Sequence, residues 1–316
     1  MYRNSPLQGQ KSLTSPFAEN EASQRKKVSV ILSCYNEEGS IVELIERLRS
    51  LSQIDEILVV DDGSTDRTAE RAESAGARVV RHPYHLGNGA AVKTGIRRAT
   101  GDVVVLMDGD GQHPPEEISK LIDGIGEFDM VVGARSGRSE VSRFRTFGNK
   151  MLAKVAEYLA GTKIPDLTSG FRAVKREKAL EFLHLFPNTY SYPTTITLSF
   201  LKASYFVKYV FLDSIGRRRT GKSHLHPLRD GFRFLIIITR MVMLFSPLRV
   251  FLPLGLLLGA LGMFLGTINL FVSGGIRGSS IVILLSSILI VLFGFLADQV
   301  SVALRGMKGQ IDFGEK

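Results

Sequence analysis

Several features that define familiar protein classes are scarce or missing in this chain of 316 residues. Its single cysteine, Cys34, excludes an internal disulfide framework and is typical of a reducing compartment. No continuous apolar segment occurs near the N-terminus, so we expect no secretory signal there and interpret residues 1–26 as a polar, disordered tail. The absence of a Walker A sequence and of a G-x-G-x-x-G fingerprint argues against an ATPase or a dinucleotide-dependent dehydrogenase.

Charged side chains are absent from two long segments near the C-terminus, Val250 to Ser273 and Ile281 to Ala297. At about 1.5 Å of rise per residue, each helix would cover most or all of a hydrocarbon core about 30 Å thick, the second by continuing past Asp298. We therefore predict a two-helix transmembrane hairpin over residues 249–305, followed by a cytoplasmic tail at residues 306–316.

The formal net charge of +9 is concentrated just before the first apolar segment. Residues 217–249 contain a single acidic residue, Asp230. The basic residues of the same stretch are Arg217, Arg218, Arg219, Lys222, Arg229, Arg233, Arg240 and Arg249. Anionic headgroups and the positive-inside rule favour such a cluster, so we predict a lipid bilayer as a partner, and no nucleic acid. Residues 228–248 mix arginine with Phe, Ile and Met, which predicts an interfacial amphipathic helix; a soluble amphipathic helix is the alternative.

The charges around the two apolar segments also predict their orientation. Arg249 precedes the first segment, Arg305 and Lys308 follow the second, and the short connector contains only Arg277. The positive-inside rule then places both ends of the hairpin in the cytoplasm. We expect a multi-pass membrane protein with two spans and a cytoplasmic globular domain.

Residues 27–227 alternate short β-branched runs with amphipathic stretches. The rhythm begins with "VSVILSC", "IVELIERLRSL", "EILVVDD", "TAERAESAG" and "ARVVRH", and it continues through the buried strand "DVVVLMD". This β-α alternation predicts an α/β domain with an open, mostly parallel sheet and helices on both faces. Ligands of such sheets bind at the carboxyl ends of the strands.

One of these strands leads into three acceptor side chains, Asp108, Asp110 and Gln112, in "VVVLMDGDGQHPP". If the segment stays extended, a period of two points all three to one side. Carboxylate and amide oxygens suit Mg²⁺ or Mn²⁺ better than zinc, and Gly109 and Gly111 allow the backbone to approach a ligand. A solvated acidic turn that caps the next helix is the alternative.

Two further strand ends carry polar groups. Tyr35, Asn36 and Glu37 follow the first strand, and Asp61 and Asp62 follow the second. An aromatic ring for stacking, carboxylates for the base or ribose, and a metal site for a diphosphate together predict a nucleoside-diphosphate pocket.

A set of ordered motifs resembles a known family. "ILSCYNEE", "VVDDGSTDRT", "GNGAAVKTGI", "GDVVVLMDGDGQHPP", "MVVGAR", "DLTSGFRA" and "RTGKSH" are similar to the motifs of GT-A glycosyltransferases of family 2. The similarity is greatest to the dolichol-phosphate mannose synthase-like, polyprenyl-phosphate glycosyltransferase branch, and it covers roughly residues 28–227. It implies a Rossmann-like mixed sheet with helices on both faces, and the paired apolar segments resemble those of bacterial and archaeal members.

The resemblance implies roles for individual residues. Tyr35, Glu37 and Asp62 would line the nucleoside pocket, with Val60 beneath the base. Asp108 and Gly109 would contact the ribose or the metal, while Asp110 and Gln112 would complete the Mg²⁺ or Mn²⁺ site. The groups expected to act on the diphosphate, the sugar or the lipid phosphate are Arg135, Arg218 and Lys222. Asp110, Arg135 and Arg218 are the implied catalytic residues.

Three positions depart from the family pattern. Ser33 stands where the family usually has proline, Asn88 where it often has lysine, and His224 where lysine usually follows the serine of the basic motif. A neutral His224 would bind phosphate more weakly than lysine, and Lys222 could take its place.

The resemblance implies inverting transfer of a single hexose from a nucleotide diphosphate sugar, of the GDP-mannose or UDP-glucose type, to polyprenyl or dolichyl phosphate at the cytoplasmic membrane face. An anionic acceptor needs no strong general base, so alignment and charge neutralisation would carry the reaction. Another lipid or glycan acceptor, such as diacylglycerol or a growing polysaccharide, is one alternative. A non-catalytic membrane partner that binds sugar nucleotides or lipids is another. A processive synthase would carry Q-x-x-R-W, and this chain has no tryptophan. Homo-oligomerisation is left open.

Overall fold

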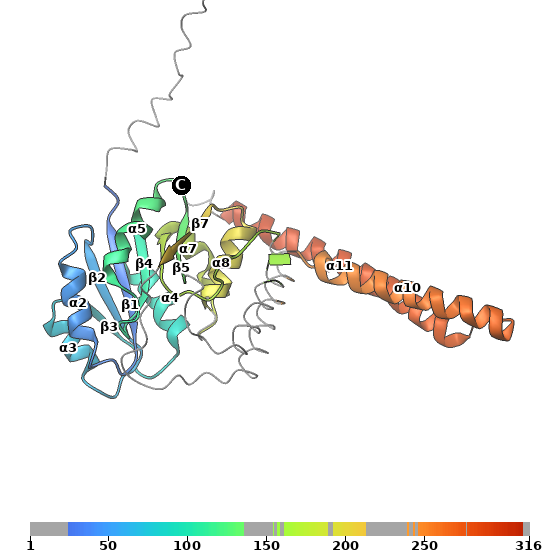
Figure 1. Cartoon of the computed structure of the whole chain (residues 1–316), viewed down its shortest axis with the longest axis horizontal. Helices are drawn as coiled ribbons and strands as arrows, with labels where there is room; N and C mark the ends of the chain where they lie inside the picture. Colours follow the sequence, from blue (N-terminus) through green and yellow to red (C-terminus); the bar gives the residue numbers. More distant parts are fainter. Residues whose placement is uncertain are drawn as a thin grey trace, which may run out of the picture.

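The computed structural model describes residues 25–135, 154, 157–158, 161–188, 192–212, 239, 243, 246–275 and 277–311. These residues form a sheet domain covered by helices and a pair of long helices that project from it (Figure 1). Most of the predicted N-terminal tail and of the predicted interfacial helix lies outside the described residues.

The sheet has seven strands in the order β3-β2-β1-β4-β6-β5-β7. Their bounds are β1 Val28–Cys34, β2 Glu56–Asp61, β3 Arg78–Arg81, β4 Val103–Asp108, β5 Met130–Arg135, β6 Arg172–Lys175 and β7 Val207–Leu212. β6 runs antiparallel to both β4 and β5, and every other pair is parallel. The mixed sheet implied by the family resemblance is therefore confirmed.

Helices cover both faces of the sheet, and their bounds are α2 Ile41–Arg49, α3 Thr68–Ser74, α4 Asn88–Arg98, α5 Ile118–Ile122, α7 Arg176–Phe182 and α8 Tyr192–Lys202. Short 3₁₀ turns, Pro115–Glu117 and Asp123–Ile125, flank α5, and a third covers Leu183–Leu185. Because side chains alternate along a strand, Leu32 packs among α2 and α5 while the adjacent Ile31 packs against α4. Burial on both faces explains why the central strands are apolar throughout.

The register of the parallel strands brings their carboxyl ends together. Cys34 of β1 lies beside Asp61 of β2, and Ser33 lies beside Asp108 of β4. The polar groups that follow these strands consequently occupy one edge of the sheet, as expected for this class of fold.

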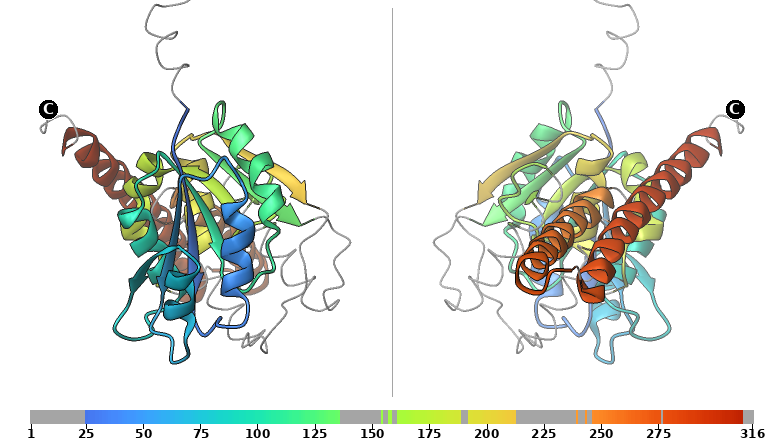
Figure 2. Two further views of the ribbon diagram at one scale, coloured as in Figure 1. Left: turned by 90° about the vertical axis from the view of Figure 1, so that its left-hand side faces the viewer. Right: turned by 90° about the vertical axis from the view of Figure 1, so that its right-hand side faces the viewer.

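The C-terminal helices α10 (Leu248–Ser273) and α11 (Gly278–Ile311) form an antiparallel hairpin, visible from the side in Figure 1 and from two other directions in Figure 2. Gly274, with φ of +68°, caps α10 in the left-handed conformation that favours glycine. The two helices pack closely because glycines of α10 face α11 and have no side chain to separate them. A Cβ at Gly255 would lie only 2.4 Å from Cγ2 of Val291.

Most apolar side chains of the hairpin point outward. Two stretches, 248–272 and 278–303, are long and apolar enough to cross a membrane, and in an apolar 18-residue window of each only 11% and 17% of the residues are buried. Phe271 is 84% exposed and Leu257 is 69% exposed. Such a surface is stable in lipid and costly in water, which distinguishes the hairpin from the core helices of a soluble domain. α11 continues to Ile311, beyond the predicted end of the hairpin at residue 305.

Hydrogen bonds connect the base of the hairpin to the sheet domain. Lys202 Nζ at the end of α8 donates to Ser246 Oγ at 2.9 Å. Arg249 Nη1, in the first turn of α10, donates to the carbonyl oxygen of Tyr158 at 2.9 Å. The hairpin therefore begins directly beside the sheet domain.

Candidate active site

Asp108, the last residue of β4, is held on one side by two polar side chains. Asn88 Nδ2 donates to Asp108 Oδ1 at 3.2 Å, and Ser33 Oγ lies 3.4 Å from the same oxygen. The backbone N–H of Asp108 points to His113 Nδ1 at 3.4 Å, and the His113 ring stacks on Phe171. Both positions at which the chain departs from the family pattern near this site, Ser33 and Asn88, thus contact the same carboxylate oxygen.

The chain turns after Asp108, so the condition under which a two-residue period would point Asp108, Asp110 and Gln112 to one side is not met. β4 ends at Asp108, and Gly111 adopts φ of +70°, which reverses the chain direction. Asp110 Oδ1 accepts a hydrogen bond from the backbone N–H of Gln112 at 3.1 Å, as in an Asx turn. This turn links Asp110 to the Gln112 backbone.

A glycine on the neighbouring loop leaves space beside Asp108. A Cβ at Gly170 would lie 3.3 Å from Asp108 Oδ2 and 3.2 Å from the Tyr192 hydroxyl. Gly170 belongs to the "TSGFRA" segment that enters β6. Ser33 and Asn88 hold the first oxygen of Asp108, whereas the second lies on the side that this glycine keeps open.

The electrostatic environment of this edge is acidic. Burial raises the pKa of the Cys34 thiol well above its ordinary value, and the charges of Glu37, Asp61, Asp108 and Asp110 raise it further. Burial likewise raises the pKa of Tyr192, and the charge of Asp108 adds to the effect. The smaller, electrostatic part of both shifts comes from these carboxylates, whose negative charge a bound cation would neutralise.

The donors fit a hard divalent cation such as Mg²⁺ or Mn²⁺ because they are oxygen atoms. Within the described part of the chain, no three His, Cys, Asp or Glu side chains gather as a metal-binding group. A cation here would therefore need the Gln112 amide, water or the oxygens of a diphosphate in addition to the carboxylates. Beside Asp108, the buried Asn88 Oδ1 lacks a hydrogen-bond partner among the described residues.

The residues expected around the nucleoside differ in their exposure. Tyr35 is 41% exposed at the end of β1, whereas Val60 is fully enclosed in the core on the α4 side of the sheet. Glu37 is buried, and its backbone N–H donates to Thr68 Oγ1 at 2.8 Å. Of these three side chains, only Tyr35 offers a large accessible surface.

Asp62 is buried and accepts contacts from four groups. Asp62 Oδ1 lies 2.7 Å from the ring Nδ1 of His82 and accepts a hydrogen bond from the backbone N–H of Leu86 at 3.0 Å. Asp62 Oδ2 accepts a hydrogen bond from the backbone N–H of Gly87 at 2.7 Å and lies 2.8 Å from Nδ1 of His85. Its carboxylate thus fixes the loop that connects β3 to α4.

Comparisons with known proteins agree with this geometry. Residues 29–182, which include β1 to β6 and the polar strand ends, match the glycosyl transferase family 2 profile. Residues 29–182 are a family 2 glycosyltransferase domain. Residues 246–303 match a second family, the GtrB C-terminal hairpin, and they coincide with α10 and most of α11. The resemblance identified from the sequence motifs is confirmed by both matches.

Among curated proteins, the chain is 38% identical over 164 residues to a dolichol-phosphate mannosyltransferase of Pyrococcus furiosus, covering 48% of this chain and 47% of that protein. It is 34% identical over 169 residues to an undecaprenyl-phosphate 4-deoxy-4-formamido-L-arabinose transferase of Pectobacterium carotovorum, covering 50% and 52%. The chain thus spans about half the length of the curated relatives it matches.

Among solved structures, the chain is similar to glucosyl-3-phosphoglycerate synthase from Mycobacterium tuberculosis. The structure of that enzyme with Mn²⁺ and UDP-glucose matches with a TM-score of 0.55 and 26% identity, covering 73% of this chain and 85% of that one. The shared GT-A fold agrees with the mixed sheet of this chain.

Several predicted site residues lack a described side chain. Arg135 is the last residue of β5, and only its backbone position is described. Arg218, Lys222 and His224 lie outside the described residues. Their proposed contacts with phosphate therefore stay predictions.

Sequence reasoning missed the part that His82 and His85 play in the glycosyltransferase domain. Both follow β3, which is parallel to β2, and the loop after it reaches the same sheet edge as the other strand ends. The two histidines could have been found by applying the strand-end rule to this third strand as well.

Proposed function

We propose that this protein transfers one hexose from a nucleotide diphosphate sugar, of the GDP-mannose or UDP-glucose type, to polyprenyl or dolichyl phosphate with inversion of the anomeric carbon. The observation that carries the proposal is the acidic oxygen cluster around Asp108 in a domain joined directly to an apolar helix hairpin. Two similar proteins are named as transferases acting on dolichol phosphate and undecaprenyl phosphate.

Asp108, Asp110 and Gln112 are the residues that would hold the divalent cation. Ser33 and Asn88 orient the Asp108 carboxylate, and Asp110 accepts the backbone N–H of Gln112 in the turn that follows. When bound, Mg²⁺ or Mn²⁺ would neutralise charge on the diphosphate leaving group. The carboxylates whose charge adds to the effect of burial on the Cys34 pKa, Glu37, Asp61, Asp108 and Asp110, support a cation at this edge.

The donor nucleotide would lie across the carboxyl ends of β1, β2 and β4. Tyr35 would contact the nucleoside directly, while the buried Glu37, Val60 and Asp62 would shape the pocket from beneath. Gly109 has no room for a side chain, since its Cβ would lie 2.3 Å from Cys34 Sγ, so it would contact the ligand through its backbone. Arg135 would face the diphosphate or the sugar.

The acceptor supports a mechanism without a strong general base. A polyprenyl phosphate is anionic at neutral pH, so its oxygen can attack the anomeric carbon once the two substrates are aligned. Arg218 and Lys222 would bind the lipid phosphate near the membrane surface. Each displacement inverts the anomeric centre because the acceptor attacks opposite the leaving diphosphate.

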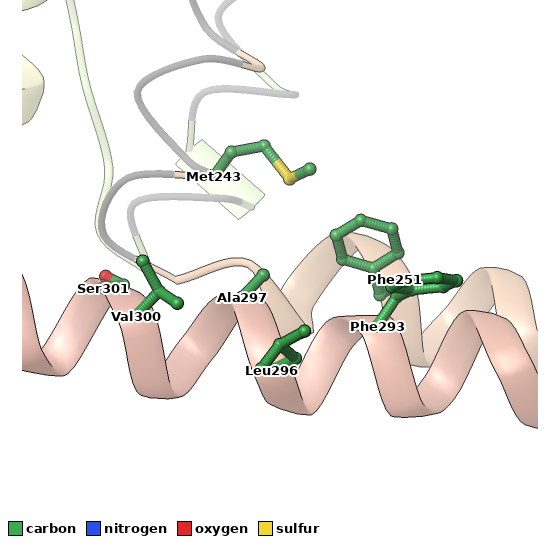
Figure 3. Close-up of a pocket in the computed structure, with 7 residues that line it drawn as sticks. All are labelled: Met243, Phe251, Phe293, Leu296, Ala297, Val300 and Ser301. Atoms are coloured by element: carbon green, nitrogen blue, oxygen red, sulfur yellow. The ribbon is translucent and has the colours of Figure 1, made fainter.

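An apolar cavity at the base of the hairpin suits the lipid part of such an acceptor. The cavity has a volume of about 410 Å³ (Figure 3), and its lining is formed by Met243, Phe251, Phe293, Leu296, Ala297, Val300 and Ser301. It adjoins the segment where the hairpin leaves the sheet domain, so a prenyl unit there would keep its phosphate at headgroup level.

A transfer assay tests the proposal. Membranes containing the protein are incubated with polyprenyl phosphate, Mg²⁺ or Mn²⁺, and radiolabelled GDP-mannose or UDP-glucose. Metal-dependent labelling of the lipid supports the proposal, and membranes with the Asp110→Ala variant are the control. Absence of any labelled lipid with all common sugar donors would refute it.

Two alternatives predict different products. A transferase acting on diacylglycerol or a polysaccharide would give a neutral glycoside that survives mild acid, whereas a polyprenyl phosphate sugar is hydrolysed. Its neutral acceptor would also need a general base. A non-catalytic sugar-nucleotide or lipid-binding partner would bind the donor without any turnover, even when polyprenyl phosphate is supplied.

A further inference from the structure

Arg172 carries a positive charge in the interior of the sheet domain. It is the first residue of β6, where it pairs with Leu106 of β4, and its side chain is 0% exposed. Among the described residues, its guanidinium forms hydrogen bonds to neutral groups and no ion pair with a carboxylate. A buried charge of this kind costs free energy that an apolar side chain of similar size would not, so the contacts it makes indicate its role.

The guanidinium of Arg172 joins two segments that are separate in sequence. Nη2 donates to the backbone carbonyl oxygen of Ser169, in the loop that enters β6. Nη1 donates to the carbonyl oxygen of Pro193 at 3.2 Å and to Thr197 Oγ1 at 3.0 Å, both in the first turns of α8. Because the guanidinium is planar and rigid, these bonds fix the distance between the loop and the helix.

Side-chain alternation explains why Arg172 reaches α8. Phe171, one residue earlier, packs in the core on the side of α2 and α5, whereas Val174 packs on the side of α4 and α8. Arg172 lies two residues before Val174 on the same strand, so it points to the α8 face. The loop and α8 are thus joined across this buried face of the sheet.

Each of the two joined segments carries a group that lies beside Asp108. Gly170 directly follows Ser169, and Tyr192 directly precedes Pro193. A Cβ at Gly170 would lie 3.3 Å from Asp108 Oδ2 and 3.2 Å from the Tyr192 hydroxyl. The carboxylate and the hydroxyl therefore border the same space, which is open because residue 170 is glycine.

Electrostatic effects connect the same groups. Burial raises the pKa of Tyr192, the charge of Asp108 raises it further, and the charge of Arg172 opposes the shift. The hydroxyl therefore stays protonated at neutral pH, between an anion on the side of the open site and a cation on the side of the core.

We propose that Arg172 is a positioning residue for sugar transfer: by holding the Ser169–Gly170 peptide against α8, it sets where Gly170 and the Tyr192 hydroxyl lie relative to Asp108. Its side chain is fully buried, so it acts through these groups and contacts no substrate itself. This inference rests on the proposed function, because it takes Asp108 to act in the transfer reaction.

Kinetics of the full-length protein in detergent test the inference. Arg172→Lys keeps the charge but loses the planar fork, so kcat should fall about tenfold to 100-fold as the groups beside Asp108 shift. Affinity for UDP or GDP with Mn²⁺, measured by isothermal titration calorimetry, should not change, since the loss concerns the reacting geometry. Arg176→Lys is the matched control, because its guanidinium also bonds two carbonyl oxygens, those of Ile96 and Arg97, beyond the other end of β6.

A second pair of variants tests the helix side of the link and leaves the charge in place. Thr197→Val removes the hydroxyl that accepts from Arg172 and keeps the shape of the side chain, so kcat should fall, though by less than in Arg172→Lys. Added to Arg172→Lys, it should cause little further loss, because both substitutions break the same link. Ser199→Ala is the control, since the buried Ser199 hydroxyl donates to the carbonyl oxygen of Thr195 within α8. Thr197→Val decides the question if Arg172→Lys does not fold.

Thermal unfolding of each variant separates positioning from a purely stabilising role. A stabilising role predicts a lower unfolding temperature with wild-type kcat per folded molecule, and this result in the folded Arg172 and Thr197 variants would overturn the inference. A parallel loss of UDP or GDP affinity would also overturn it, because the whole site would then be distorted. Wild-type turnover with unimpaired variants leaves the proposed function intact, whereas a wild type that transfers no sugar from any common donor refutes both.

Discussion

Gly170 lies so close to Asp108 that one added methyl group would reach 3.3 Å from the carboxylate oxygen Oδ2. The two residues are 62 positions apart in sequence, and they meet because β6, which follows Gly170, pairs with β4, which ends at Asp108. The loop thus leaves open the side of the carboxylate that Ser33 and Asn88 do not occupy.

The first prediction concerns this space. Gly170→Ala should lower the rate of sugar transfer by about tenfold to 100-fold, because displacement of Asp108 by a fraction of an ångström misplaces the reacting groups. Gly126→Ala is the control, since a Cβ at Gly126 has nothing within 4 Å and its φ is −61°. Initial rates of both folded variants provide the measurement, and an unimpaired Gly170→Ala enzyme would contradict the assignment.

The second prediction concerns the metal. Asp110→Ala should reduce both Mn²⁺ affinity and transfer by roughly 100-fold while the protein stays folded, because Asp110 lies in a turn and contributes little to core packing. Removal of metal with EDTA should likewise stop transfer by the wild type, and added Mn²⁺ or Mg²⁺ should restore it. Glu127→Ala removes an exposed carboxylate and serves as the control. Retained metal binding in the Asp110 variant would show that this carboxylate is not a ligand.

The third prediction follows from the raised pKa of Cys34. The buried thiol stays protonated in the folded state, whereas the unfolded chain loses this proton above the ordinary thiol pKa of about 8.5. The unfolded state then binds fewer protons, so stability should fall as pH rises, by at most about 1.4 kcal/mol for each pH unit. Thermal unfolding between pH 8 and 10 should show a steeper decline for the wild type than for Cys34→Ala. Parallel curves would contradict the buried, protonated thiol.

The fourth prediction concerns topology. Single cysteines at Ser279 and near Gly314, in a Cys34→Ser background, would be labelled with a membrane-impermeant reagent. The position at Ser279, in the first turn of α11 beside the connector, should react in intact cells, whereas the position near Gly314 should react only after lysis. The reverse pattern would place the proposed active site outside and remove its supply of cytosolic nucleotide sugars.

Much of the fold could be predicted because its signals are local. Strands β1, β2 and β4 are mostly apolar and rich in Val, Ile and Leu, and α2 has the amphipathic spacing of a helix that packs on one face. The strand order was not predictable in the same way. β6 inserts between β4 and β5 in the antiparallel direction, and this depends on long connections whose paths no local pattern determines.

The candidate site, like the fold, was predictable from the sequence only where the signal is local. The positions of Tyr35, Asp62 and Asp108 at strand ends follow from the sequence, since parallel strands bring their carboxyl ends to one edge. The direction of the chain after Asp108 did not follow, because the left-handed conformation of Gly111 replaced the expected extended segment with a turn. The period-two rule applies only while the backbone remains a strand.

The sequence by itself determined the element types, the acidic strand ends and the two long apolar helices, because each depends on residues that are neighbours along the chain. Only the tertiary structure decided what these groups contact. Asp62, expected beside a nucleoside, is occupied by the loop that carries His82 and His85, while Asn88 and Ser33 meet at one oxygen of Asp108. Such contacts join segments 20 to 75 residues apart, so they depend on strand register and loop paths that are set only when the whole sheet packs.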